Sequence, residues 1–158
     1  MKLLGVFLLF LCSSSIGVYL AFKSRKKVSD LKELINFLKH VRTRIVYFNA
    51  PLNTIYSGYT ADSQGFREFL KSLKTAEMYD ILNDSPPLSL SKNSMDALKE
   101  MSKELGKTFK DKQTAMLDNC INLLEKEYTE TNAKAPQTYK LYISLGIYIG
   151  ILLVILFL

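Results

Sequence analysis

The stretch Leu3–Phe22, LLGVFLLFLCSSSIGVYLAF, contains no charged side chain. At about 1.5 Å of rise per residue, a helix of this length reaches roughly 30 Å, the thickness of the hydrocarbon core of a bilayer. We therefore expect residues 1–22 to form an N-terminal transmembrane helix. A cleaved signal peptide or a lipoprotein leader is the alternative, but this stretch is longer than the apolar part of a leader and does not end in an A-x-A pattern.

The C-terminal stretch LYISLGIYIGILLVILFL, residues 141–158, is equally free of charge and predicts a second transmembrane helix. Small residues recur four positions apart in both stretches, at Ser13 and Gly17 and at Gly146 and Gly150. Because small side chains let helix backbones approach closely, these positions are expected to form the packing face of the membrane helices.

The charged side chains lie almost entirely between the two apolar ends. All of them except Lys2 fall within residues 23–140. The whole-chain averages, a mean hydropathy of +0.07 and 23% charged residues, therefore describe neither part of the chain. This division excludes a simple soluble globule, and two cysteines are too few for a disulfide-stapled secreted domain.

A basic cluster follows the first apolar stretch directly and consists of Lys23, Arg25, Lys26 and Lys27. By the positive-inside rule, this cluster places the central domain in the cytoplasm. It could also attract anionic lipid headgroups. Between Ile45 and Lys140 basic and acidic residues nearly balance, so the isoelectric point near 9.2 does not indicate nucleic-acid binding.

Apolar residues in the central domain recur at helical spacing, and no alternating pattern typical of a strand occurs. The segments with helical spacing are 28–48, 52–59, 66–82, 95–105 and 116–128. We therefore predict an all-α fold, in which a helical bundle of five or six helices (23–140) lies between the two transmembrane helices.

Local signals mark the expected ends of several helices. Pro51 suits the first turn of a short helix. Asn83–Pro87 contains two prolines and predicts a loop. Ser91 or Ser94 can cap the helix that follows. Pro136 is expected to end or kink the helix that leads into the second transmembrane stretch.

The tripeptide Gly106-Lys107-Thr108 resembles the end of a phosphate-binding loop. The first glycine of that motif would fall at Met101, and the segment follows a helix rather than a strand, so an ordinary turn is the better interpretation. Gly106 suits the end of a helix, and Thr108 with Asp111 has the spacing of a capping box.

Side chains that could perform catalysis or hold a metal are scarce. His40 has no second imidazole with which to share a metal. Cys12 lies in a membrane stretch and Cys120 on the apolar face of a helix, so a disulfide between them is excluded. We therefore expect a protein that is not an enzyme and that has no metal, no cofactor, no small-molecule substrate and no nucleic-acid partner.

Five positions between the apolar ends carry a family resemblance: Tyr47, Pro51, Gly106, Thr108 and Gln113. In their order and in the two-anchor layout, the chain resembles the stage III sporulation protein AB family of endospore-forming bacteria. That family is a relative of the inner-membrane platform protein F of type II secretion. The resemblance extends over the whole chain.

The resemblance implies a non-enzymatic membrane component of the secretion-like channel complex that joins mother cell and forespore. It implies a place in the mother-cell membrane around the forespore, with the central domain in the cytoplasm. By analogy with secretion platforms, that domain would dock a cytoplasmic secretion-type ATPase, and the membrane helices would pack against other channel subunits. The joint at Pro136 would then transmit the ATPase contact to the membrane complex. A membrane-anchored adaptor unrelated to sporulation and a membrane-anchored enzyme are the alternatives.

Overall fold

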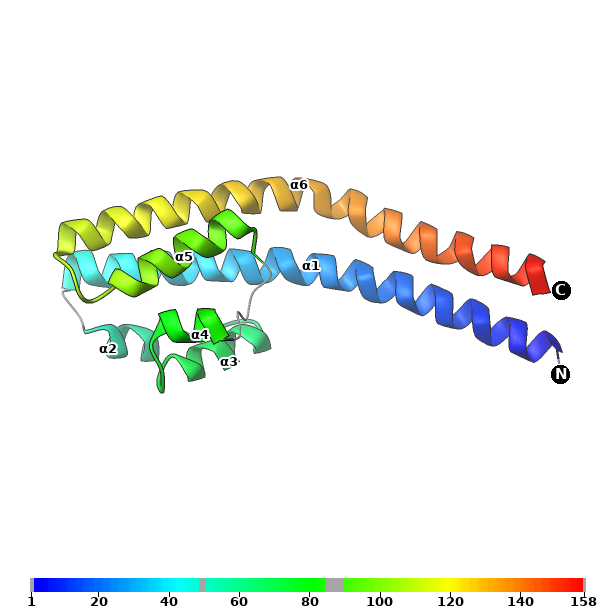
Figure 1. Cartoon of the computed structure of the whole chain (residues 1–158), viewed down its shortest axis with the longest axis horizontal. Coiled ribbons are helices and arrows are strands. Elements are labelled where there is room, and N and C mark those ends of the chain that lie inside the picture. The colour runs from blue at the N-terminus through cyan, green and yellow to red at the C-terminus, as the bar shows by residue number, and fades with distance from the viewer. Residues whose placement is uncertain (1, 49–50, 85–89, 158) are drawn as a thin grey trace. The chain divides into compact units, whose positions relative to one another are not determined.

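The computed structural model describes residues 2–48, 51–84 and 90–157. All regular secondary structure in these residues is helical, which confirms the all-α fold class (Figure 1). The helices are α1 (Lys2–Phe48), α2 (Leu52–Ser57), α3 (Gln64–Ser72), α4 (Met78–Asp84), α5 (Lys92–Glu104) and α6 (Lys110–Phe157).

The chain consists of two compact units. Unit 1 comprises Met1–Val28 and Thr131–Leu158, and unit 2 comprises Ser29–Glu130. Both boundaries fall inside long helices, so α1 and α6 each contribute to both units. The membrane boundaries expected after residue 22 and before residue 141 lie within the same two helices and stay predictions.

In unit 2, α1 and α6 lie side by side in antiparallel directions (Figure 1). Three side-chain contacts join them in this register, from Lys39 to Glu125, from Arg42 to Asp118 and from Lys110 to the carbonyl of Val46. The second contact is bidentate, because two guanidinium nitrogens donate to the two carboxylate oxygens. A bidentate pair fixes the geometry more tightly than a single bond, so it sets the register of the two helices.

The apolar stripe predicted for residues 28–48 forms much of the core of unit 2. Its buried members are Leu31, Leu34, Ile35, Leu38, Val41 and Ile45. Phe48, which continues the stripe, is 62% exposed instead. Phe37, which the stripe omits, is fully buried.

Phe37 is the centre of an aromatic cluster that the spacing did not predict. Its ring centroid lies 5.2–6.5 Å from those of Tyr56, Tyr59, Phe66 and Phe69. Such pairs contribute about 0.5–1.5 kcal/mol each beyond the area that they bury. The cluster therefore holds α2 and α3 against α1.

Backbone caps fix the short helices. Pro51 directly precedes α2, and Ser91 accepts a hydrogen bond from the backbone N–H of Ser94 at the start of α5, so both predicted helix starts are confirmed. Glu33 of α1 is buried and accepts hydrogen bonds from the backbone N–H groups of Asp62 and Ser63. This carboxylate anchors the turn before α3 and had no signal in the sequence pattern.

Pro136 lies inside α6, which continues to Phe157. Of the two outcomes expected at this residue, the end of the helix is therefore wrong. Proline removes the backbone hydrogen bond to the carbonyl four residues earlier, which here belongs to Asn132. Both Pro136 and Asn132 are exposed, so solvent can hydrogen bond to the freed carbonyl while the helical turns on either side remain intact.

Candidate functional site

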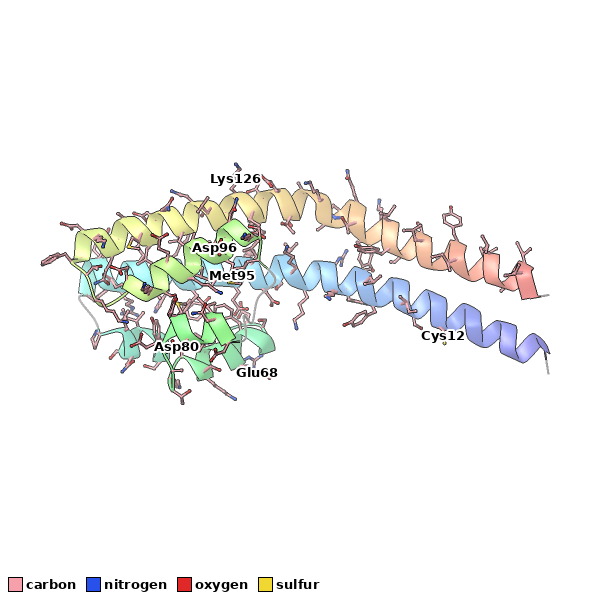
Figure 2. All side chains as sticks on the ribbon, in the orientation of Figure 1. Cys12, Glu68, Asp80, Met95, Asp96 and Lys126 are labelled. Atoms are coloured by element: carbon pink, nitrogen blue, oxygen red, sulfur yellow. The ribbon has the colours of Figure 1, made fainter. Side chains whose placement is uncertain are left out.

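Exposed large apolar side chains are concentrated in unit 1. Of the exposed large apolar side chains in the described residues, all but four belong to unit 1. Those of unit 1 include Ile16, Tyr19 and Leu152. The outer faces of unit 2 carry charged side chains such as Glu68 and Asp80 (Figure 2). Exposing apolar surface to water costs about 25 cal/mol per Å², whereas lipid tails remove this cost. The surface of unit 1 thus suits a bilayer.

One helix of the described part, α6, is long and apolar enough to cross a membrane. Its most apolar stretch has a mean hydropathy of 2.0, and only 12% of that stretch is buried. The transmembrane helix expected at residues 3–22 does not meet the same criterion within the described residues, and it stays a prediction.

Three of the four expected packing residues lie where α1 and α6 meet in unit 1. Gly17, Gly146 and Gly150 are buried. A Cβ atom on Gly17 would lie 2.7 Å from the carbonyl oxygen of Tyr142 and 3.1 Å from the Cα of Gly146. These distances leave no room for a larger residue at position 17. The side chain of Ser13 lies outside the described residues.

The basic cluster lies on the part of α1 that belongs to unit 1. Lys23 and Lys26 are exposed, and Lys27 is partly buried. The guanidinium carbon of Arg25 lies 4.2 Å from the centroid of the Tyr139 ring. This cation–π contact joins α1 to α6, an arrangement that a count of charges could not reveal. The role of the cluster in membrane topology stays a prediction.

The five residues that carried the family resemblance converge at one end of unit 2, where α1 ends and α6 begins. Pro51, Gly106 and Gln113 line one cavity of about 470 Å³. Tyr47 lies in the last turn of α1 and is 74% exposed. Thr108 belongs to the turn that joins α5 to α6.

Gln113 holds the turn between α5 and α6 together. Its side-chain oxygen accepts a hydrogen bond from the backbone N–H of Gly106 at 3.2 Å, and its side-chain nitrogen donates to the carbonyl of Thr108. Gly106 has a φ of +80°, the left-handed conformation expected of a glycine after a helix end. The capping box predicted for Thr108 and Asp111 is wrong, because α6 begins at Lys110, so Thr108 is not at the cap position, and its hydroxyl donates to the carbonyl of Glu104 instead.

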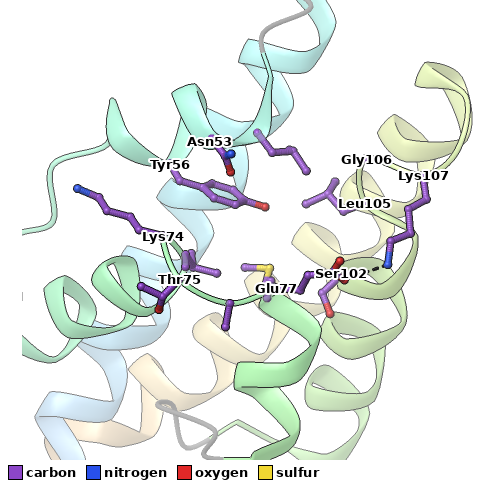
Figure 3. A pocket seen from close by; sticks show the side chains of 13 residues that line it. Asn53, Tyr56, Lys74, Thr75, Glu77, Ser102, Leu105, Gly106 and Lys107 are labelled. Atoms are coloured by element: carbon purple, nitrogen blue, oxygen red, sulfur yellow. Dashed lines mark hydrogen bonds and ion pairs between the residues drawn. The ribbon is translucent and has the colours of Figure 1, made fainter.

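A second cavity, of about 400 Å³, lies beside α2 (Figure 3). Residues of α2, the α3–α4 linker, the end of α5 and the α5–α6 turn line it. The two cavities share the lining residues Leu52, Asn53 and Gly106, so they adjoin each other beside α2. We refer to this pair of cavities as the α2 groove.

The hydroxyl of Tyr56 points into the α2 groove, toward Leu105 (Figure 3). Only 8% of the Tyr56 residue is exposed, and its hydroxyl has no hydrogen-bond partner within the described part of the chain. Burial raises the pKa of Tyr56 to about 12, so the hydroxyl stays protonated at neutral pH. It is therefore an unused hydrogen-bond donor in the cavity.

An ion pair lies at the edge of the same groove. Lys107 Nζ and Glu77 Oε2 are 2.9 Å apart and join the α5–α6 turn to the α3–α4 linker (Figure 3). Hydrogen bonding to Glu77 raises the pKa of Lys107. Lys107 of the Gly106-Lys107-Thr108 tripeptide thus has a carboxylate partner. This supports the interpretation of the tripeptide as an ordinary turn rather than as a phosphate-binding loop.

Of the four large apolar side chains that are exposed in the described part of unit 2, three lie at the end where α1 ends and α6 begins. They are Tyr47, Phe48 and Phe109, which we call the aromatic end. Phe109 is 90% exposed. The guanidinium carbon of Arg44 lies 5.0 Å from the centroid of the Phe48 ring. The helical pattern placed Phe48 in the core and gave no signal for Phe109, so sequence reasoning missed this surface.

The described residues hold no group of three or more histidine, cysteine or acidic side chains that could bind a metal ion. Cys120 is buried, which raises its pKa to about 12, and Cys12 is exposed in unit 1 (Figure 2). Burial, and secondarily the charge of Arg44, lower the pKa of His40. The two features of the described residues that could bind a partner are the α2 groove and the aromatic end.

A comparison with known families gives one clear result. The family model described as stage III sporulation protein AB matches residues 2–158. The comparisons with curated proteins and with solved structures give no match. Because the match covers nearly the whole chain, the resemblance drawn from the five motif positions is confirmed. The chain belongs to the stage III sporulation protein AB family.

Proposed function

We propose that the protein is a non-enzymatic membrane subunit of the channel complex between mother cell and forespore, and that unit 2 docks a cytoplasmic secretion-type ATPase. The observation that carries the proposal is the distribution of exposed large apolar side chains, which are abundant in unit 1 and, in unit 2, gather mainly at the aromatic end. Membership of a sporulation family supports the biological setting.

Unit 1 is the proposed membrane anchor. The close approach of Gly17 and Gly146 brings two helix backbones together, as small residues commonly do where membrane helices associate. The outward-facing apolar residues then contact lipid or other channel subunits. The basic cluster next to the first apolar stretch favours an orientation with unit 2 in the mother-cell cytoplasm.

The aromatic end is the proposed docking surface. Aromatic residues and arginine are enriched among the residues that dominate binding energy at protein interfaces. Tyr47, Phe48 and Phe109 with Arg44 have this composition. Tyr47 belongs both to the aromatic end and to the motif positions, and Phe109 directly follows the motif residue Thr108, which supports a shared role for this end of unit 2.

The proposal is tested by purifying the tagged full-length chain in detergent from sporulating cells and quantifying the proteins that accompany it. We expect channel subunits and the ATPase with the unaltered chain. Phe109→Ser should lower ATPase recovery by about tenfold, which corresponds to about 1.4 kcal/mol and lies within the range of a binding hot spot.

Leu123→Ser is the matched control, because Leu123 is the fourth exposed large apolar residue of unit 2 and lies outside the aromatic end. It should leave the recovery of the ATPase unchanged. Absence of the ATPase from the unaltered complex would contradict the docking role. Equal recovery with Phe109→Ser would show that the aromatic end is not the docking surface.

A further inference from the structure

We propose that the α2 groove binds an acidic segment of a partner protein, with an apolar side chain of that segment inside the cavity and its carboxylates against lysines at the edge. This inference rests on the proposed docking role of unit 2. Beyond that role, the inference states the charge and polarity of the bound segment. It also identifies a second contact surface beside the aromatic end.

The charges that line the groove are unbalanced. They comprise three lysines, Lys74, Lys107 and Lys110, and one carboxylate, Glu77. Glu77 pairs with Lys107. The ammonium group of Lys110 donates to a backbone carbonyl, and Lys74 has no ion pair in the described residues, so two positive charges lack a carboxylate. Asp80 and Glu104 also interact electrostatically with Lys107, so the excess of positive charge lies at Lys74 and Lys110.

The interior of the groove is suited to an apolar side chain with a nearby hydrogen-bond acceptor. Leu73, Met78 and Leu105 line the cavity with apolar atoms. The Tyr56 hydroxyl points into the same space without a partner in the described part of the chain (Figure 3). A hydroxyl that faces the cavity without a protein partner can donate to a carbonyl or carboxylate oxygen of the bound segment, and this hydrogen bond would favour binding.

The position of the groove favours a protein segment over a small molecule. The two cavities run along α2, and Lys110, which lines one of them, follows Phe109 of the aromatic end directly in the chain. A segment that lies in the groove can therefore continue onto the aromatic end. Two adjoining contact surfaces of this kind suit a partner that is itself a protein.

The test uses the full-length chain in sporulating cells with the photo-crosslinking residue benzoylphenylalanine in place of Asn53. Asn53 is exposed and lines both cavities. Thr75, which is also exposed and lines the groove, is the second crosslinking position, in case the first variant does not accumulate. Mass spectrometry then identifies the crosslinked segment. We expect a segment of another protein with a net negative charge.

Charge reversal separates groove binding from accidental proximity. Lys74→Glu should lower the yield of the crosslink at least about tenfold. Lys71→Glu makes the same charge change on α3 at an exposed position outside the groove and should leave the yield unchanged. Tyr56→Phe removes only the hydroxyl and should lower the yield about three- to tenfold, as expected for the loss of one hydrogen bond.

A crosslink to a neutral or basic segment, to lipid or to a second copy of the chain would overturn the inference, as would the absence of any crosslink from both positions. Equal yields from Lys74→Glu and Lys71→Glu would also overturn it. If Lys74→Glu leaves the crosslink unchanged while the ATPase co-purifies with the unaltered chain, the groove inference fails and the proposed function stands. If an acidic segment is crosslinked but the ATPase is absent from the unaltered complex, the groove inference stands and ATPase docking fails.

Discussion

Gly17 of α1 faces Gly146 of α6 so closely that a Cβ atom on Gly17 would lie 3.1 Å from the Cα of Gly146. The same Cβ atom would lie 2.7 Å from the carbonyl oxygen of Tyr142. Backbone rather than a flexible side chain fills the space, so a larger residue would push the two helices apart. The pair therefore defines how unit 1 packs.

We expect Gly17→Leu to destabilise the helix pair of unit 1 by about 1–3 kcal/mol, the usual cost of an overpacked site. The measurement is the unfolding midpoint of the full-length chain in detergent. Val18→Leu is the control, because Val18 is 40% exposed on the next position of the same helix and can accept a larger side chain. A Gly17→Leu variant as stable as this control would show that the close approach does not exist.

Gly106→Ala should destabilise unit 2 by about 1–2 kcal/mol, because an L-residue at a φ of +80° is strained. The new Cβ atom would also lie 2.8 Å from Leu52 Cδ1. The comparison variant is Gly58→Ala, since Gly58 has a φ of −85°, which any residue adopts. Chemical denaturation of the full-length chain should show the larger loss for Gly106→Ala, and a reversed order would refute the assigned turn geometry.

The stability of unit 2 should fall as the pH drops below about 6.5, the ordinary pKa of histidine. Burial and the charge of Arg44 lower the pKa of His40, and its Nε2 atom is buried without a partner in the described residues. The unfolded chain therefore takes up a proton at a higher pH than the folded chain, and the stability contributed by neutral His40 is lost with acidification. Urea denaturation at about pH 7.5 and pH 5.5 measures the difference.

His40→Gln is the control for this pH dependence, because it removes the titrating imidazole. The variant should lose less stability than the unaltered chain between the two pH values. The same loss in both proteins would assign the pH dependence to other groups.

Cys120 should react with iodoacetamide at least about a hundredfold more slowly in the folded chain than in urea, at the same neutral pH. Its thiol is buried and its pKa is raised to about 12, so almost no thiolate forms, and the thiolate is the reactive species. The Cys12→Ser background isolates the measurement. Rapid labelling of the folded chain would mean that the face of α6 around Cys120 is open to solvent.

Local sequence signals predicted much of the helical organisation. Pro51 and Ser91 specify helix starts, and Gly106 specifies a helix end, because each acts through its own backbone geometry or through neighbours within a few residues. Apolar spacing likewise identified the core residues Leu98 and Leu124. Such features need no knowledge of tertiary structure.

Features that depend on contacts between distant segments were not predictable from local patterns. Glu33 accepts hydrogen bonds from a turn about 30 positions later, so its burial had no local signal. Phe37 lies off the apolar stripe because aromatic rings from α2 and α3 surround it on another face of α1. The expected capping box failed because Gln113 and Glu104 hold the turn instead.

The candidate site was predictable only in part. The five motif positions were identified, but neither the α2 groove nor the aromatic end was. The groove depends on how α2 lies beside the α5–α6 turn, and Phe48 is exposed in the last turn of α1, where the neighbouring elements leave it uncovered. Spacing along a helix predicts which residues share a face, but it does not predict where the partner helices end.

A titration of the purified secretion-type ATPase onto the full-length chain in lipid nanodiscs tests the docking role most directly. We expect saturable binding that is weakened about tenfold by Phe109→Ser and unchanged by Leu123→Ser. No binding, or equal binding to empty nanodiscs, would contradict the claim that this protein is a membrane-anchored docking subunit.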